Sequence, residues 1–280
     1  MTIRYLFHSC FVAESSDTIV VIDYWHDRDD GRLHHLLEET SKQVYFVVSH
    51  FHPDHYNPQI LRCKLPVDDN DHAACNHESA NKKRPYFRLR RKPLYLLSYD
   101  VVKRRRIFPA LPAAVLRPGH HYEDDNLELH AYRSTDIGIS MALRLKADEQ
   151  GETLFHCGDL NNWYFSEEGE DPEHLKVSLQ QMEGLFLSVV RELEKVYPDG
   201  LQHLCFPVDP RLGKDMLRGA TQWLYEIPAN NFYPMHFWGK YEAMAEGLKQ
   251  LQEMFPRTTF HLPEDVPEAY HALSEHITSL

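Results

Sequence analysis

The chain has 280 residues, which is long enough to bury a large hydrophobic core. Its 30 basic and 42 acidic residues give a formal net charge of -12, which argues against a surface devoted to nucleic acid. Five cysteines without a C-x-x-C pair indicate neither a disulfide framework nor a structural zinc knuckle. Because there is no signal-peptide pattern and no apolar run near the ~20 residues of a membrane helix, we expect a cytoplasmic protein without a membrane span.

The first third of the chain predicts alternating strands and helices. Residues 2–13 and 18–24 have strand composition and are separated by a polar turn, as in a hairpin. Residues 28–40 carry leucines at helical spacing and predict a short amphipathic helix. The β-branched and aromatic run Val44–Val48 predicts a buried strand. This order of elements is typical of a sandwich with helices outside.

The loop after that strand, His50-Phe51-His52-Pro53-Asp54-His55, is the most informative segment. Imidazole nitrogen and carboxylate oxygen are ligands that zinc prefers, and four of the six residues supply them. His50 and His52, two residues apart, can bind one ion, while the turn at Pro53 directs Asp54 and His55 to a second. The alternative is a polar surface loop, as we interpret the pairs His34-His35 and His120-His121.

Residues 64–93 predict an inserted loop that changes from acidic to basic and has little apolar periodicity in its first half. Arginines interleaved with Tyr86 and Phe87 can bind an anionic or single-stranded nucleic-acid substrate by charge and stacking. The alternative is a run of charged residues exposed to solvent. A predicted strand at 93–102 is followed by a second basic cluster at 103–106. Folded over a metal site, these clusters would select a negatively charged substrate.

The remaining chain again alternates strands and helices. Strands are predicted on both sides of 134–138 within 127–145, at 153–157 and at 201–208. Helices are predicted at 174–196, 214–225, 241–254 and from 267 to the end, and Met182 and Phe186 are expected in the core. Arg211, just after one strand, is expected either to contact an anion or to open a helix.

These motifs resemble the metallo-β-lactamase superfamily. The loop at 50–55 is similar to its H-x-H-x-D-H signature, and His8-Ser9-Cys10-Phe11 with Val20-Val21-Ile22-Asp23 resembles the branch of ascorbate-phosphate lactonase-like and phospholipase D-like hydrolases. The resemblance covers nearly the whole chain. It implies an α/β (α+β) fold, a four-layer αββα sandwich, as a single domain over residues 1–280 with a charged insertion at 64–93.

The resemblance also implies a two-metal site. Its expected metal ligands are His50, His52, Asp54, His55, Asp159, His236 and Asp136. Asp159 would bridge both ions, Asp23 would orient the histidine loop from behind, and Asp136 would replace a histidine that the family usually supplies. An oxygen ligand there shifts the preference from zinc toward manganese or iron, and the alternative is a single ion.

The expected function is that of a metallo-hydrolase, in which a metal-bound hydroxide attacks an ester, lactone or phosphodiester in a small anionic substrate. Asp54 is expected to accept a proton and His8 to steady the oxyanion or leaving group, although a core role explains His8 equally well. Two alternatives are cleavage of nucleic-acid or nucleotide phosphodiesters and a non-catalytic metal-binding domain. Steep salt dependence would distinguish a nuclease.

Overall fold

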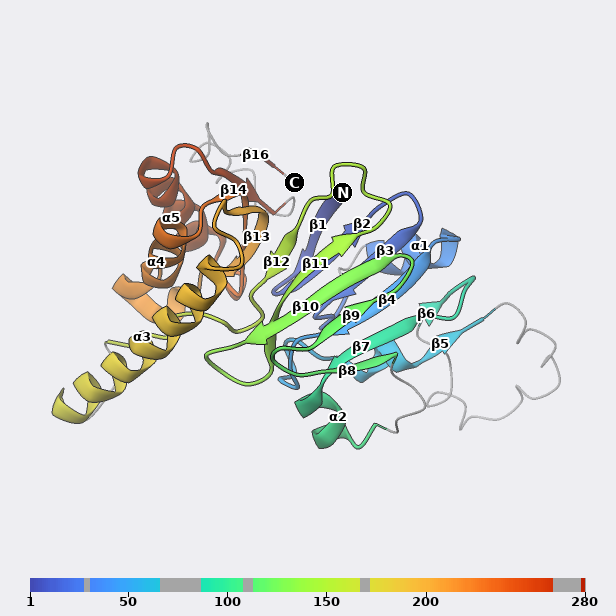
Figure 1. The fold of residues 1–280 in the computed structure, drawn as a ribbon, viewed down its shortest axis with the longest axis horizontal. Coiled ribbons are helices and arrows are strands. Elements are labelled where there is room, and N and C mark those ends of the chain that lie inside the picture. The colour runs from blue at the N-terminus through green and yellow to red at the C-terminus, as the bar shows by residue number, and fades with distance from the viewer. Residues whose placement is uncertain (28–30, 66–86, 108–112, 167–171, 264–277, 280) are drawn as a thin grey trace.

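The computed structural model describes residues 1–27, 31–65, 87–107, 113–166, 172–263 and 278–279. Two β-sheets pack face to face, and helices cover their outer sides (Figure 1). The architecture is the expected α/β sandwich of four layers.

In each sheet, the strands that come first along the chain pair antiparallel and the later strands pair parallel. The first sheet has the spatial order β1 (Thr2–Phe7), β2 (Cys10–Glu14), β3 (Thr18–Ile22), β4 (Gln43–Val48), β7 (Leu94–Ser98) and β8 (Ala114–Leu116). The second has the order β16 (Thr278–Ser279), β15 (Thr259–Leu262), β14 (Ala229–Met235), β13 (Leu201–Pro207), β12 (Leu154–His156), β11 (Ile139–Leu145), β10 (Leu127–Arg133) and β9 (His121–Glu123). A parallel pair, β5 (Cys63–Lys64) and β6 (Phe87–Arg88), stands apart.

The helices connect successive parallel strands. They are α1 (Arg32–Glu39), α2 (Tyr99–Arg105), α3 (Pro172–Glu194), α4 (Arg218–Glu226) and α5 (Tyr241–Met254), with 3₁₀ turns at Pro58–Leu61 and Pro210–Asp215. In Figure 1, α3, α4 and α5 lie together against the second sheet. No helix in these described ranges has the length and apolar character needed to cross a lipid bilayer.

Alternation along β4 explains how the layers pack. Tyr45 and Val47 face the core between the sheets, whereas Phe46 and Val48 face a second core under α1. Successive side chains of a strand point to opposite faces, so a continuously apolar strand must be covered on both sides. Leu33 and Leu37 of α1 provide that cover for the first sheet.

Several sequence predictions need correction. Residues 2–13 form two strands, because the chain turns at His8 and Ser9. The strand predicted at 93–102 ends at Ser98, and α2 begins at the next residue. This helix includes residues 103–105 of the basic cluster. The helix predicted from residue 214 begins at Arg218, after a 3₁₀ turn. The helix predicted from residue 267 is wrong at 278–279, which form β16, and the rest of it lies outside the described residues.

The predicted insertion at 64–93 lies largely outside the described residues, which resume at Phe87. Phe87 is fully buried, with its ring 5.3 Å from that of Tyr24 and 5.6 Å from that of Phe46 between centroids. It therefore belongs to the second core and is not available to stack on a nucleic-acid base.

Candidate metal centre

The histidine loop, residues 50–55, turns sharply at the carboxyl end of β4. The backbone N–H groups of His55 and Tyr56 both donate to the carbonyl oxygen of His52, at 3.0 and 2.9 Å. This turn brings the rings of His50 and His55 to a centroid distance of 4.1 Å. One short segment thus places several imidazoles close together at the end of β4.

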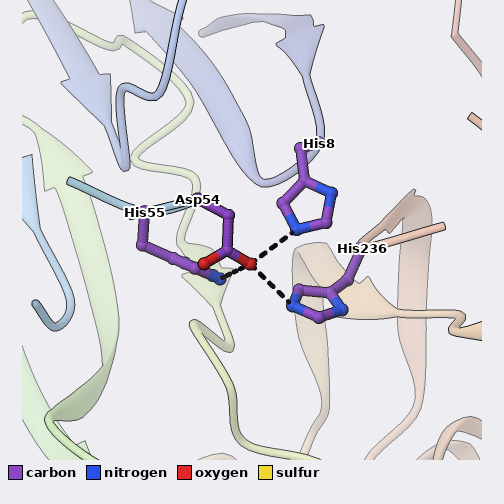
Figure 2. Close-up of side chains that lie close together, drawn as sticks. All are labelled: His8, Asp54, His55 and His236. Atoms are coloured by element: carbon purple, nitrogen blue, oxygen red, sulfur yellow. Dashed lines mark hydrogen bonds and ion pairs between the residues drawn. The ribbon is translucent and has the colours of Figure 1, made fainter. Parts of the chain in front are cut away.

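Three more segments meet this loop. Asp159 follows β12, His236 follows β14, and His8 lies in the turn between β1 and β2. Because β12, β13 and β14 run parallel, their carboxyl ends reach one edge of the sheet. Figure 2 shows the side chains of His8, His55 and His236 directed at the carboxylate of Asp54.

Strained backbone marks the same place. Among the described residues, five that are not glycine have positive φ, and they include His8 at 57°, Asp23 at 50° and His236 at 63°. This conformation costs energy for a residue with a side chain, so it persists only where surrounding contacts hold it. The observed strain supports a functional role for this edge of the sandwich.

One set of ligand atoms, which we call the His50 group, comprises His50, His52, Asp136 and Asp159. His50 Nε2 lies 3.1 Å from Asp159 Oδ2, and His52 Nδ1 lies 3.8 Å from the same oxygen. Asp136 Oδ2 lies 3.8 Å from His52 Nδ1, at the place where the resemblance implies a histidine in other members. Asp136 is the most exposed of the four, so this group opens to solvent on its side.

A second set, the His236 group, comprises Asp54, His55, His236 and Asp159. His55 Nε2 lies 3.0 Å from Asp159 Oδ1, and His236 Nε2 lies 3.5 Å from both Asp159 Oδ1 and Asp54 Oδ2. The two oxygens of Asp159 therefore face the two groups separately. A carboxylate placed in this way can join two cations and offset part of their mutual repulsion.

Buried Asp23 orients the histidine loop from behind. His55 Nδ1 donates to Asp23 Oδ2 at 2.8 Å, and the Ser49 hydroxyl donates to the same oxygen at 2.6 Å. Because that hydroxyl proton is used, Ser49 Oγ accepts from His50 Nδ1 at 2.9 Å. Asp23 thus fixes the tautomer of His55 directly and that of His50 through Ser49, as an outer carboxylate does at many metal sites.

Asp209 lies behind His236 as Asp23 lies behind His55, and this role was not predicted from the sequence. Its fully buried Oδ2 accepts from His236 Nδ1 at 2.8 Å and from Trp238 Nε1 at 3.2 Å. Arg211 also donates to Asp209 through Nε and Nη2, at 3.0 and 2.6 Å. The available signal was an acid directly after the predicted strand 201–208, a position like that of Asp23 at the end of residues 18–24, whereas the role of Asp23 came from the family resemblance.

The arrangement of lone pairs fits bound cations. His50, His55 and His236 each use their Nδ1 proton on an outer partner, so in each ring only Nε2 remains to face the carboxylate of Asp159. An unprotonated Nε2 in this position would point its lone pair at a carboxylate oxygen. Acceptors facing acceptors repel unless a cation lies between them. In agreement, the buried atoms His55 Nε2, His236 Nε2 and Asp159 Oδ1 have no hydrogen-bond partner among the described residues.

The charges of the centre are also matched. Burial alone would raise the pKa of Asp159, but the imidazoles of His55 and His236 outweigh it and hold that pKa well below its ordinary value. Burial lowers the pKa of His8 to about 4, so its ring is neutral at pH 7. Burial would lower the pKa values of His55 and His236, but the carboxylate of Asp159 outweighs it and raises both, so a divalent metal ion would bind there by displacing protons.

Two glycines allow these segments to approach closely. A Cβ on Gly138 would lie 2.2 Å from the Ser49 carbonyl oxygen and 2.4 Å from His50 Cβ. A Cβ on Gly158 would lie 2.8 Å from the Ile139 carbonyl oxygen. Both glycines have positive φ. Glycine is therefore required by packing at position 158, where it lets Asp159 approach the histidine loop.

A cavity of about 500 Å³ opens onto both groups. Its lining includes the polar side chains of Asp54, Asp159 and His236 and the apolar side chains of Trp163, Phe165 and Met182. The rings of Trp163 and Phe165 are nearly parallel, at 8°. Met182 was expected in the core, but it is only partly buried and lines this cavity. Only folding placed α3, which carries Met182, beside the candidate ligands.

Arg211 and His8, the two remaining predicted residues, differ in whether they line the cavity. Arg211 lines the cavity, pairs with Asp209 and stacks its guanidinium on the Trp238 ring at 4.7 Å, so its head group is held in place. His8 is not among the described residues that line the cavity. Its Nε2 lies 3.1 Å from Asp54 Oδ2, and its ring packs 4.5 Å from the Trp238 ring between centroids.

A family model described as a beta-lactamase superfamily domain matches residues 2–178, more than half of the chain. The comparison with curated proteins gives no match. Among solved structures, the fold is similar to that of Igni18, a novel metallo hydrolase from the archaeon Ignicoccus hospitalis. The TM-score is 0.53, the sequence identity is 13%, and 92% of each chain is covered.

The fold is also similar to that of CmlA, a diiron beta-hydroxylase from Streptomyces venezuelae, with a TM-score of 0.55 and 10% identity. This match covers 93% of the present chain and 52% of CmlA, so the chain spans about half the length of that protein. At these identities the likeness concerns the fold alone.

Proposed function

Because the chain belongs to the metallo-β-lactamase superfamily, we propose that it is a metal-dependent hydrolase of an ester, lactone or phosphodiester. The observation that carries the proposal is the position of Asp159, whose two oxygens face two separate sets of imidazoles. The buried atoms without hydrogen-bond partners lie at the same place. The resemblance to the lactonase-like branch supports including lactones among the candidate substrates.

In this proposal the His50 group holds one ion and the His236 group holds the other, with Asp159 shared. Bound cations would supply Lewis-acid activation of water and of the scissile group. Zinc suits the imidazole-rich His236 group, whereas the added carboxylate of Asp136 favours manganese or iron in the His50 group. Iron belongs in a metal screen also because the fold neighbour CmlA is described as a diiron protein.

Asp54 keeps its expected role in metal binding in this proposal, but neither Asp54 nor His8 takes the catalytic role expected from sequence. Burial would raise the pKa of Asp54, but the imidazoles of His236 and His8 beside its carboxylate outweigh it and lower that pKa strongly. A carboxylate with such a low pKa is a weak proton acceptor. We therefore assign Asp54 to metal binding, and His8 to holding Asp54 in position through the 3.1 Å contact.

The cavity supports a substrate that combines negative charge with an apolar group. The apolar group would lie against Trp163, Phe165 and Met182, which exclude water from that side. The anionic group would face Arg211, whose guanidinium is held by Asp209 and Trp238. A guanidinium that is already ordered loses little side-chain entropy when it binds an anion.

A second candidate is cleavage of nucleotide or nucleic-acid phosphodiesters. The observation that favours it is the position of α2 beside the histidine loop, where the Phe51 N–H donates to Asp100 Oδ2 at 2.8 Å. Arg104 of this helix lies 4.5 Å from the Phe51 ring, which places its positive charge against the histidine loop at Phe51. A phosphate backbone could follow such a surface.

The test is metal analysis followed by a substrate screen. Metal-free protein would be reconstituted with zinc, manganese or iron(II) and assayed on aryl esters, lactones and bis(p-nitrophenyl) phosphate, each with and without an apolar group. We expect hydrolysis that chelation abolishes and metal restores. A protein that binds no transition metal, or that stays active without one, would contradict the proposal.

The dependence on salt concentration distinguishes a hydrolase of small substrates from a nuclease. Affinity for a single-stranded oligonucleotide should fall steeply between about 50 and 200 mM salt if phosphates are bound, whereas turnover of a small ester should change little. Arg104→Gln should weaken oligonucleotide binding specifically. If oligonucleotides bind with no salt dependence, the nuclease candidate fails and the small-substrate hydrolase stands.

A further inference from the structure

A second cluster of histidine and carboxylate lies on the outer face of the second sheet, where β9 forms its described edge. His121 of β9 and His130 of β10 are direct cross-strand partners. Glu128 is two residues from His130, so it points to the same face, whereas Leu127, Leu129 and Ala131 point into the core. Antiparallel register thus gathers two imidazoles and a carboxylate from one hairpin.

The ligand atoms of this surface cluster are close enough to share one ion. Glu128 Oε1 lies 3.0 Å from His130 Nε2 and 3.8 Å from His121 Nε2, and all three atoms lie within 4.8 Å of one another. A tetrahedral ion with bonds of about 2.1 Å holds its ligands about 3.4 Å apart. The two imidazole rings are stacked at 13°, with centroids 4.3 Å apart, so both can direct a nitrogen to one side.

Accessibility and local charge also permit binding. The side chains of His121 and His130 are each 43% exposed, and that of Glu128 is 25% exposed, so a hydrated ion can reach them and keep water as a further ligand. The neighbouring cation Lys146 is paired with Glu123, which leaves Glu128 to the two histidines. Arg144 stands opposite Glu128 in the register with β11 and is the remaining nearby positive charge.

We propose that His121, Glu128 and His130 form a binding site for a divalent transition-metal ion, separate from the centre around Asp159. Two imidazole nitrogens and one carboxylate oxygen favour copper, nickel or zinc over magnesium or calcium. The ion links the edge strand β9 to β10 by bonds between side chains, in addition to the hydrogen bonds of the sheet. The site does not depend on the proposed hydrolase activity.

The experiment uses the full chain already loaded with zinc at the main centre, to which nickel(II) or copper(II) is added in equilibrium dialysis. We expect one additional equivalent in the natural sequence, and at least tenfold weaker binding in His121→Ala, His130→Ala and Glu128→Gln. His120→Ala is the matched control, because His120 is an adjacent exposed histidine whose Nδ1 lies 3.2 Å from the Val115 carbonyl oxygen. It should bind as the natural sequence does.

Two further measurements keep the result interpretable. Copper(II) at the site should show nitrogen hyperfine splitting in electron paramagnetic resonance, and that signal should be lost in His130→Ala. Circular dichroism would verify that each variant is folded, and the zinc content of the main centre should be unchanged. The proposal is overturned if no additional equivalent binds, if His120→Ala loses it equally, or if His121→Ala and His130→Ala retain it.

Discussion

The chain places similar donors in two very different settings. The centre around Asp159 is largely buried, although His52 and Asp136 reach solvent, and it is assembled from the histidine loop and segments distant in sequence. The surface cluster of His121, Glu128 and His130 is exposed and comes from one pair of strands. Outer acids fix the rings of the buried centre, whereas His130 at the surface is paired with Glu128, itself a candidate ligand.

The difference indicates which of the two clusters is suited to the proposed catalysis. Burial removes competing water, and Asp23 and Asp209 direct imidazole lone pairs to fixed points. In the exposed surface cluster, the nearby acids Glu123 and Glu128 approach the histidines at Nε2, the atoms that would bind the ion. We therefore expect activity to depend on the first cluster alone.

The largest effect should come from removing ligands of the buried centre. His50→Ala combined with His236→Ala removes one imidazole from each group, and should lower hydrolysis by roughly a thousandfold or more, because the lost cations supply several kcal/mol of transition-state stabilisation. Bound metal would be measured together with the rate. His121→Ala combined with His130→Ala is the matched control and should leave the rate unchanged. An equal loss of hydrolysis in both double variants would contradict the assignment of activity to the centre around Asp159.

A smaller effect is expected from the acid behind His236. Asp209→Asn cannot hold the His236 tautomer as the carboxylate does, so metal affinity should fall by roughly ten- to a hundredfold. Competition with a chelator measures this change. Asp215→Asn is the control, because Asp215 is also largely buried and paired with an arginine at 3.3 Å. Similar losses in both variants would show that the effect is only structural.

The exposed member of the His50 group gives a third test. Asp136→His replaces an oxygen donor by nitrogen, and should raise zinc affinity relative to manganese by roughly tenfold. Metal competition in the intact protein measures this ratio. Asp125→His, at another exposed aspartate, should not change it. An unchanged ratio in Asp136→His would mean that Asp136 is not a ligand.

The smallest effect concerns Asp124, which belongs to neither cluster. Burial would raise its pKa, but hydrogen bonds from Tyr45 and Tyr122, both 2.7 Å, outweigh it and lower that pKa. Asp124→Asn should reduce the free energy of unfolding by about 1 kcal/mol at pH 7, without loss of metal. Because the folded pKa lies below 3.8, the difference should persist above that pH and disappear as the pH falls below it. Urea unfolding at several pH values measures it.

Much of the fold could be predicted from local patterns. The apolar run at 44–48 is β4, the interruption at 134–138 separates β10 from β11, and the leucine spacing at 28–40 gives α1. Such patterns suffice because one strand or helix must bury its own apolar face. The turn at His8 was missed, because its left-handed φ depends on contacts with other segments, such as the N–H of His236 donating to the His8 carbonyl at 3.2 Å.

The sequence by itself determined the donor types and their order along the chain, from the histidine loop to Asp159 and His236. It could not rank Asp209 above other acids that follow strands, nor place Met182 beside the ligands, since both depend on how β13 and α3 pack. It also gave no reason to connect His121 with His130. Only the register of β9 and β10 did so, because register is decided by the pairing of whole strands and not by neighbouring residues.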